Sequence, residues 1–205
     1  MRIVSFLLLA AAIVVAIVSL STFHSEKPLT SIDHRLFPDT SCFQEGDVIL
    51  RRGRGIISDM ACEFSVHEKK YSHAGLLVRN TGHWSVLHVA GGEGAAFDGI
   101  RLEPLQQFLA DSVATFFAVY RLSDDNSIRQ NAVITALQYW RLHVLFDTYF
   151  DLSEDRKLYC TELIYQSYRK ASSGKISLPL TTFTGVTYIS LENVYCNSFA
   201  QLIDS

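Results

Sequence analysis

Two apolar runs joined by a tight-turn sequence constrain the fold more than any other feature of this chain. Residues 73–79 and 84–90 are rich in branched and aromatic side chains, and the four residues between them read Asn-Thr-Gly-His. Such a pattern is typical of an antiparallel β-hairpin closed by a short turn. The chain is therefore expected to contain an antiparallel sheet, and this hairpin fixes part of its pairing.

The turn also predicts the register of the hairpin. If Arg79 faces Trp84 across the turn, Gly75 lies opposite His88. Because successive side chains of a strand point to opposite faces, His73 then shares a face with His88. Diagonal neighbours of this kind are about 7 Å apart at the backbone, so the two imidazoles can reach one another. We expect a pair of histidines on an otherwise apolar hairpin.

A cysteine stands at the predicted start of a helix. The tetrad Tyr159-Cys160-Thr161-Glu162 opens an amphipathic stretch that ends at the Ser-Ser-Gly of residues 172–174. The unpaired amides and the dipole of a first helical turn favour an anion. The position therefore predicts a thiol pKa lowered toward neutrality and a nucleophile. A buried structural cysteine is the alternative interpretation.

The cysteine and the two histidines can form a catalytic set. Thiol hydrolysis needs a nucleophile, a histidine that handles its proton and a third polar group that orients the histidine. Cys160, His73 and His88 fill these roles in that order if the hairpin packs against the start of the helix. The alternatives are a strand-edge and a core histidine, or a zinc site built from the three residues. The cysteines lack the spacing of a structural zinc site, and we predict no metal and no cofactor.

The first residues predict export or membrane anchoring. Arg2 precedes an apolar run over residues 3–20, which is close to the length of a minimal membrane span. We predict a signal peptide or anchor at 1–21, a tether at 22–42 and one domain at 43–205. This places the protein outside the cytoplasm, in the periplasm or held to the membrane. In such an oxidising compartment, Cys42 and Cys196 are candidates for a disulfide.

Composition and patterning narrow the class further. The net charge is −3, and no run of like charges forms a basic stripe, so a nucleic-acid partner is disfavoured and we predict none. We predict further strands at 46–50 and 114–122, a loop at 51–55, helical segments at 56–64, 104–109 and 124–144, and a strand with surface turns after 174. These elements define an α+β domain with a small antiparallel sheet carrying helices on one side.

Four short motifs follow one another along the domain. They are Gly46-Asp47-Val48-Ile49-Leu50, Tyr71-Ser72-His73-Ala74-Gly75, the Phe-Asp pairs within 146–151, and the run 159–165 around Cys160, with a weaker echo at 188–194. Their order resembles that of the YiiX/YebB-like proteins, which are circularly permuted members of the NlpC-type papain-like cysteine hydrolases. The resemblance covers residues 43 to 200.

The resemblance implies a permuted papain-like fold, with a small antiparallel sheet packed against helices and the nucleophile at a helix N-terminus. Cys160 matches the nucleophile, and His73 matches the family histidine. His88 matches the third polar position, where YiiX-like relatives often carry Glu. Tyr159 and Glu162 also match the cysteine motif, and we predict that they contribute to the substrate site.

Two aspartates near these motifs have a simpler interpretation. Asp47 and Asp147 are expected to cap or turn the chain and not to act as bases.

The combined interpretation is an exported or membrane-tethered thiol hydrolase that cleaves an amide bond, with cell-wall peptide as substrate. Relatives similar to lecithin retinol acyltransferase handle lipid acyl groups through a thioester, so a lipid acyl hydrolase or acyltransferase is the alternative enzyme. A non-catalytic module that binds peptide or lipid is the alternative outside catalysis. Association with a membrane through residues 3–20 is expected in either case.

Overall fold

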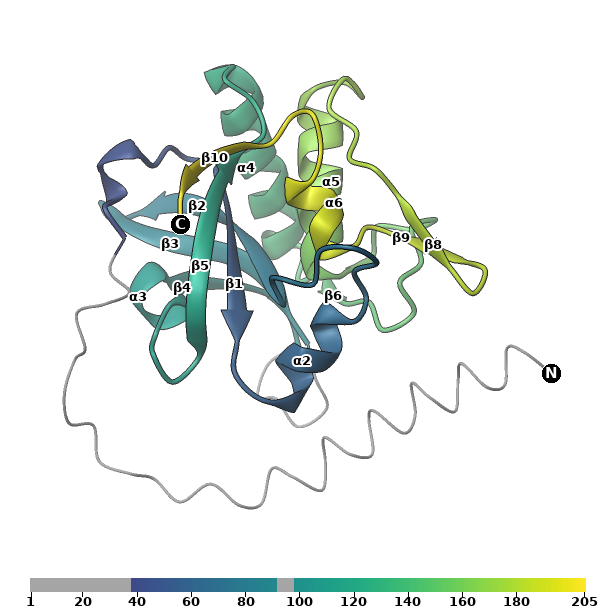
Figure 1. Cartoon of the computed structure of the whole chain (residues 1–205). Coiled ribbons are helices and arrows are strands. Elements are labelled where there is room, and N and C mark those ends of the chain that lie inside the picture. Colours follow the sequence, from purple (N-terminus) through teal and green to yellow (C-terminus); the bar gives the residue numbers. More distant parts are fainter. Residues whose placement is uncertain (1–37, 92–97) are drawn as a thin grey trace.

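A six-stranded antiparallel sheet forms the centre of the protein (Figure 1). The computed structural model describes residues 38–91 and 98–205. In spatial order the strands are β10 (Gln201–Asp204), β5 (Ala114–Arg121), β1 (Val48–Gly53), β2 (His73–Asn80), β3 (His83–Ala90) and β4 (Gly99–Pro104). The predicted signal or anchor, most of the predicted tether and residues 92–97 after β3 lie outside the described residues.

Helices cover both faces of this sheet. They are α2 (Ile56–Cys62), α3 (Leu105–Phe108), α4 (Asn126–Arg141), α5 (Cys160–Ala171) and α6 (Leu191–Tyr195), with a short 3₁₀ turn η2 (Thr40–Cys42). Two small ribbons complete the fold, β6 (Leu145–Phe146) with β7 (Lys157–Leu158), and β8 (Thr181–Phe183) with β9 (Val186–Tyr188). The helices α4 and α5 lie side by side behind the sheet (Figure 1).

Alternation along the strands separates two apolar clusters. Val48 and Leu50 of β1 point into the larger cluster, which includes the apolar sides of α4 and α5. Ile49, between them, points into a smaller cluster with Leu105 and Phe108 of α3. The prediction of helices on one side therefore holds for the long pair, while the short α3 covers the other face. The central strands are buried on both faces, which matches their nearly continuous apolar sequences.

The hairpin has the predicted register. Thr81 and Gly82 both adopt positive φ, at 47° and 83°, as a two-residue type I′ turn requires. Arg79 pairs with Trp84, and Leu77 pairs with Val86. The prediction that the turn aligns the two strands in this way is confirmed.

The structure departs from the sequence prediction at several strands. β1 continues through residues 51–53, where a loop was predicted, because Arg51 and Arg52 pair with two phenylalanines of β5. The edge strands β4 and β10 and the short helix α6 were not predicted. Each of these elements is short, and the two strands are defined by pairing with partners distant in sequence.

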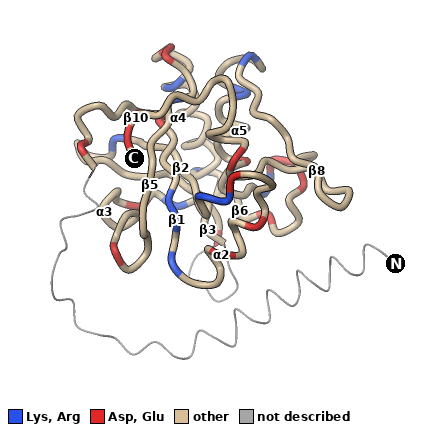
Figure 2. The backbone as a smooth tube through the Cα atoms, viewed as in Figure 1, with Lys and Arg blue, Asp and Glu red and all other residues tan. Residues whose placement is uncertain are grey.

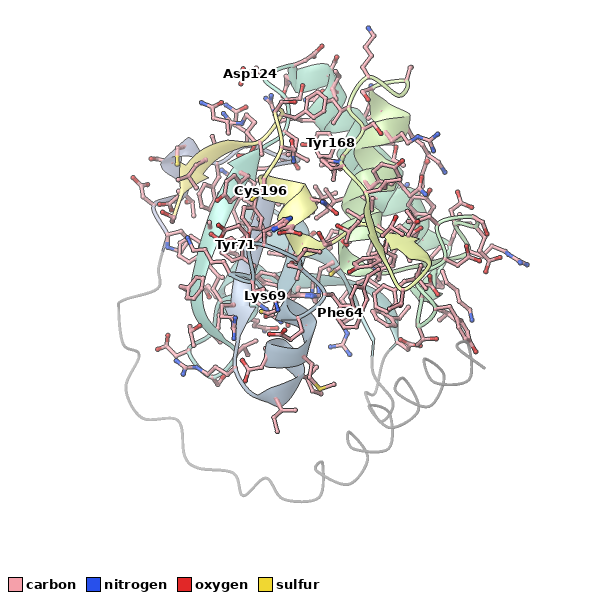
Figure 3. All side chains as sticks on the ribbon, turned by 45° about the vertical axis from the view of Figure 1, so that its right-hand side comes forward. Phe64, Lys69, Tyr71, Asp124, Tyr168 and Cys196 are labelled. Atoms are coloured by element: carbon pink, nitrogen blue, oxygen red, sulfur yellow. The ribbon has the colours of Figure 1, made fainter. Side chains whose placement is uncertain are left out.

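The candidate disulfide between Cys42 and Cys196 is not formed, because all four cysteines are free. Cys42 lies on η2, where its thiol contacts the carbonyl of Asp39. Cys196 caps the end of α6, beside the Tyr71 side chain (Figure 3). The two thiols therefore belong to different parts of the sheet surface.

The charged side chains are distributed without a basic groove. Figure 2 shows Lys and Arg at the lower end of β1 with acidic segments close by around α2. Arg52 pairs with Asp59 at 2.6 Å, and Lys69 pairs with Glu63 at 2.5 Å, so much of this positive charge is balanced locally. Over the parts of the chain that the structure describes, no helix combines the length and apolar character needed to cross a membrane.

Candidate active site

Cys160 is the first residue of α5 and is held from both sides. The hydroxyl of Tyr159 accepts a hydrogen bond from the backbone N–H of Ile189 at 2.8 Å. The hydroxyl of Thr161 donates to the carbonyl of the same residue at 2.6 Å. The residues on either side of Cys160 are thus both hydrogen-bonded to the backbone of Ile189, just ahead of α6, which anchors the start of α5.

The rest of α5 explains why the helix begins there. Leu163, Ile164 and Tyr168 form its buried side and pack against the sheet. The Tyr168 hydroxyl, which lies between α5 and the sheet (Figure 3), donates to the carbonyl of Gly46 at 2.6 Å. Apolar packing and this buried hydrogen bond place the start of α5 against β2, the strand that carries His73.

The two histidines contact each other as the register predicts. His73 Nε2 lies 2.8 Å from His88 Nδ1, and the two rings are perpendicular with centroids 5.0 Å apart. His88 is only 2% exposed, whereas His73 keeps partial exposure. Phe108 of α3 packs against both rings, at centroid distances of 5.8 and 5.2 Å. This packing holds the imidazoles in one relative orientation.

A carboxylate that the sequence reasoning missed continues this pair. Glu103 Oε2 lies 3.2 Å from His88 Nε2. Arg101 is the partner of His88 across β3 and β4, and Glu103 two residues later points to the same face. The interaction with His88 is the main reason that the pKa of Glu103 is lowered, so the side chain is a carboxylate near neutral pH.

This carboxylate decides which nitrogens carry protons. An ionised carboxylate only accepts hydrogen bonds, so we assign the proton of neutral His88 to Nε2, facing Glu103. His88 Nδ1 is then an acceptor, and the proton of His73 resides on Nε2. His73 Nδ1 is left without a proton. The chain Glu103–His88–His73 therefore ends in a basic nitrogen.

The thiol lies beside this chain without bonding to it. The backbone N–H of Ala74, the residue after His73, points at the Cys160 sulfur and favours its anion. Within residues 38–91 and 98–205, no hydrogen bond joins the thiol to either imidazole. The structure thus brings the two histidines together and places Cys160 next to the strand that carries the first of them.

Burial keeps the Cys160 thiol and the His73 imidazole uncharged before substrate binds. Desolvation raises the pKa of Cys160 to about 11, although backbone N–H groups of Ala74, Thr161 and Cys160 itself oppose it. Desolvation and the neighbouring His88 hold the pKa of His73 well below its ordinary value. The sequence prediction of a thiol pKa near neutrality is therefore wrong, because the helix terminus is buried against the sheet and loses more from desolvation than it gains from the amides.

The two predicted substrate residues lie inside the protein. Tyr159 is 2% exposed, and Glu162 is fully buried in the first turn of α5. Desolvation and the nearby Asp147 raise the pKa of Glu162 to about 8, so this carboxyl is largely protonated at neutral pH. These positions support the structure around Cys160, and their contact with substrate stays a prediction.

The two aspartates have the predicted structural roles. Asp47 is buried, accepts the backbone N–H of Gln44 and pairs with Arg121 at 2.8 Å. Asp147 accepts the backbone N–H groups of Tyr149 and Asp151. The prediction that they cap or turn the chain is confirmed.

Gly75 is required by the close approach of the two histidine strands. A Cβ at this position would lie 2.5 Å from Val86 Cγ1 and 3.0 Å from His88 Cβ. We expect Gly75→Ala to lower the free energy of unfolding by about 1–3 kcal/mol, measured by urea denaturation, because the strand cannot accommodate the methyl group.

A double variant separates this clash from other effects. Val86→Ala removes the nearest atom, so the loss for Gly75→Ala with Val86→Ala should be smaller than the sum of the two single losses. Simple additivity of the two losses would contradict the clash as the cause.

The fold and the position of the thiol define the class. An antiparallel sheet with a histidine strand, packed against a helix that begins at a cysteine, is the arrangement of papain-like cysteine hydrolases. Here the histidine strand precedes the cysteine helix in the chain, which is the permuted order. Residues 42–199 match the family described as permuted papain-like amidase enzyme, YaeF/YiiX, C92 family, and the chain belongs to this family. The predicted resemblance, the fold class and the assignment as a cysteine hydrolase are confirmed.

A solved structure has the same fold. It is the crystal structure of the metalloprotein YiiX from Escherichia coli O157:H7, which is 20% identical to this chain with a TM-score of 0.65. The match covers 79% of this chain and 97% of the YiiX chain. No curated protein matches the sequence. At this identity the likeness shows the fold.

The description of YiiX as a metalloprotein raises the question of a metal in the present chain. In the part of the chain that the structure describes, no group of three or more His, Cys, Asp or Glu side chains could hold a metal ion. Both nitrogens of His88 already face His73 and Glu103. The described residues do not fit a metal site, and the chemistry below uses the side chains alone.

Proposed function

We propose that this protein hydrolyses an amide bond of a cell-wall peptide outside the cytoplasm, with Cys160 as nucleophile and His73 as its base. His88 and Glu103 orient His73. The observation that carries the proposal is the chain of contacts from Glu103 through His88 to His73, which ends beside the start of α5. Membership of an amidase family supports the bond type. The basic residue and apolar run at the N-terminus support export.

The chemistry needs one proton carrier. His73 Nδ1 takes the thiol proton as the Cys160 sulfur attacks the amide carbonyl. The resulting imidazolium gives that proton to the departing amine, and an acyl-enzyme thioester remains. Water then attacks the thioester with His73 as base, which releases the carboxylic acid and restores the thiol. No oxidant, metal or cofactor is consumed.

Two features lower the energy of the charged intermediates. The positive charge that develops on His73 is stabilised through His88 by the Glu103 carboxylate, as in other triads. The backbone N–H of Cys160 lies at a helix start and can donate to the oxyanion of the tetrahedral intermediate. Because the resting thiol and imidazole are both neutral, proton transfer accompanies attack and does not precede it.

The neutral resting state predicts the pH dependence of alkylation. Iodoacetamide reacts with the thiolate, and a raised thiol pKa means that the thiolate fraction falls at every pH below that value. We expect labelling of Cys160 at pH 6 to be at most about a tenth of the rate at pH 9, measured by mass spectrometry of the Cys160 peptide. A Cys42→Ser, Cys196→Ser background removes the exposed thiols. Fast labelling at pH 6 that collapses in His73→Ala would instead reveal a thiolate–imidazolium pair.

The function itself is tested with defined substrates. The full chain is incubated with purified cell-wall peptides and, separately, with acyl lipids, and the products are identified by mass spectrometry. We expect a new amine and a new carboxylic acid from the peptide only, with no product from the lipid. Cleavage confined to the lipid would replace this proposal with a lipid acyl hydrolase or acyltransferase. No turnover and no acyl-enzyme with either substrate would leave a binding module.

Export is tested separately from catalysis. The full chain is expected in the membrane or extracytoplasmic fraction, and its removal from that fraction on deletion of residues 1–21 supports the predicted segment. Recovery of the full chain with cytoplasmic proteins would overturn this part of the proposal.

A further inference from the structure

Arg51 lies in the same cluster as the two histidines, although nothing in the sequence motifs points to it. It is the partner of His73 across β1 and β2, so the two side chains share a face of the sheet. Its guanidinium carbon is 4.1 Å from the centroid of Phe108, and its Nη1 donates to the Phe108 carbonyl at 2.5 Å. Phe108 also contacts both histidine rings. One aromatic ring thus holds a cation and two imidazoles together.

The charge of Arg51 is not neutralised by a direct pair. Its Nε is buried and has no hydrogen-bond partner, and no carboxylate of the described residues lies within ion-pair distance. The ionisable groups that interact with it are His73 from β2, His88 from β3, Glu103 from β4 and Cys160 from α5, and Arg101 of β4 is a second cation acting on His88. Glu103, the one acid among them, contacts His88.

A partly buried cation without an acidic partner costs folding free energy. Its position suggests what it does for the site. A positive charge disfavours protonation of a nearby imidazole and favours ionisation of a nearby thiol. From one place, Arg51 favours the free base of His73 and the thiolate of Cys160, whereas Glu103 stabilises the imidazolium that forms later on His73.

We propose that Arg51 is a positioning residue whose charge keeps His73 and His88 unprotonated and helps the Cys160 thiol to release its proton. This inference rests on the proposed roles of Cys160 and His73.

The direction of the effect follows from the sign of the charge. Burial is the largest cause of the lowered pKa of His73 and of His88, and the charge of Arg51 lowers both further. Burial raises the pKa of Cys160, and the charge of Arg51 opposes this with a smaller effect. Without the charge, His73 would bind a proton from solvent at a higher pH, and below that pH it could not act as a base. The thiol would ionise only at a higher pH. The pH below which activity is lost and the pH at which thiol alkylation sets in should therefore both rise when the charge is removed.

The test uses the full chain and needs no substrate. We expect Arg51→Gln to raise the titration midpoints of His73 and His88 by about one pH unit, read by NMR of ¹⁵N-labelled histidine. The iodoacetamide profile of Cys160 should also shift upward. Gln keeps a donor for the Phe108 carbonyl, and Arg51→Lys keeps the charge and should retain midpoints close to wild type. Arg54→Gln, at an exposed arginine bonded to the Asp111 carbonyl, is the matched control and should shift neither profile.

Each other outcome decides against the inference. Unchanged midpoints in Arg51→Gln would remove the charge effect. Equal shifts in Arg51→Gln and Arg51→Lys would indicate lost packing on Phe108 instead. His73→Ala separates this inference from the proposed function. If His73→Ala abolishes hydrolysis while Arg51→Gln shifts nothing, only the role of Arg51 fails. If His73→Ala leaves hydrolysis intact, the proposed function itself fails.

Discussion

Replacing Cys160 with alanine should reduce amide hydrolysis by about four to six orders of magnitude. Removal of the nucleophile in a hydrolase that forms an acyl-enzyme leaves only the contributions of binding and of oxyanion stabilisation. No other thiol can take its place. Cys62 is buried and donates to the Tyr71 carbonyl, whereas Cys42 and Cys196 lie on other parts of the surface.

The measurement is the rate at which the amine product forms from the peptide substrate. Cys196→Ser is the matched control, because it removes an exposed thiol away from α5 and should retain the wild-type rate. Both variants should unfold at urea midpoints close to that of the wild type, since neither side chain anchors the core. Retention of more than about a tenth of the activity in Cys160→Ala would show that Cys160 is not the nucleophile.

The part of this site that could be predicted from the sequence is local. Residues 73–90 contain their own turn, and a turn with positive φ at Thr81 and Gly82 leaves one favourable register. The contact between His73 and His88 follows from that register alone. The start of α5 at Cys160 is likewise written in the amphipathic pattern that follows it.

The residues that were missed depend on pairing between distant segments. Glu103 reaches His88 only because β4 joins β3 as an edge strand, and residues 99–104 carry no clear strand pattern of their own. Arg51 was predicted in a loop, and its place beside His73 depends on strand pairing between β1 and β2. A signal for Glu103 was present in the resemblance, because relatives often carry Glu at the third polar position. Here a neighbouring strand supplies that carboxylate.

The error in the thiol pKa has a similar origin. A helix N-terminus lowers the pKa of a thiol when water can still reach the anion. The local sequence gives the helix terminus but not the packing of α5 against β2, which desolvates Cys160. Desolvation depends on tertiary contacts. The sequence of residues 159–171 alone could therefore not show that desolvation raises the Cys160 pKa by more than the backbone N–H groups lower it.

Glu103 gives the second large effect that we expect. Glu103→Gln keeps an oxygen that can accept a hydrogen bond from His88 Nε2, but it removes the negative charge at the end of the chain Glu103–His88–His73. The imidazolium that forms on His73 then loses its compensating charge, and kcat should fall by about 10²-fold with little change in KM. Glu103→Leu removes both the charge and the acceptor. His88 can then adopt the other tautomer and present a proton to His73, so kcat should fall by about 10⁴-fold.

The comparison of these two variants separates charge from orientation. Both are assayed on the same peptide substrate, with Glu154→Gln as control because that half-buried acid pairs with the exposed Arg156 away from the site. If Glu103→Gln and Glu103→Leu lose activity equally, charge alone matters and the tautomer assignment is wrong. If both keep at least half of the wild-type kcat, Glu103 lies at the site without acting on it. Only a graded loss, with Leu well below Gln, fits a carboxylate that both orients His88 and stabilises the charge on His73.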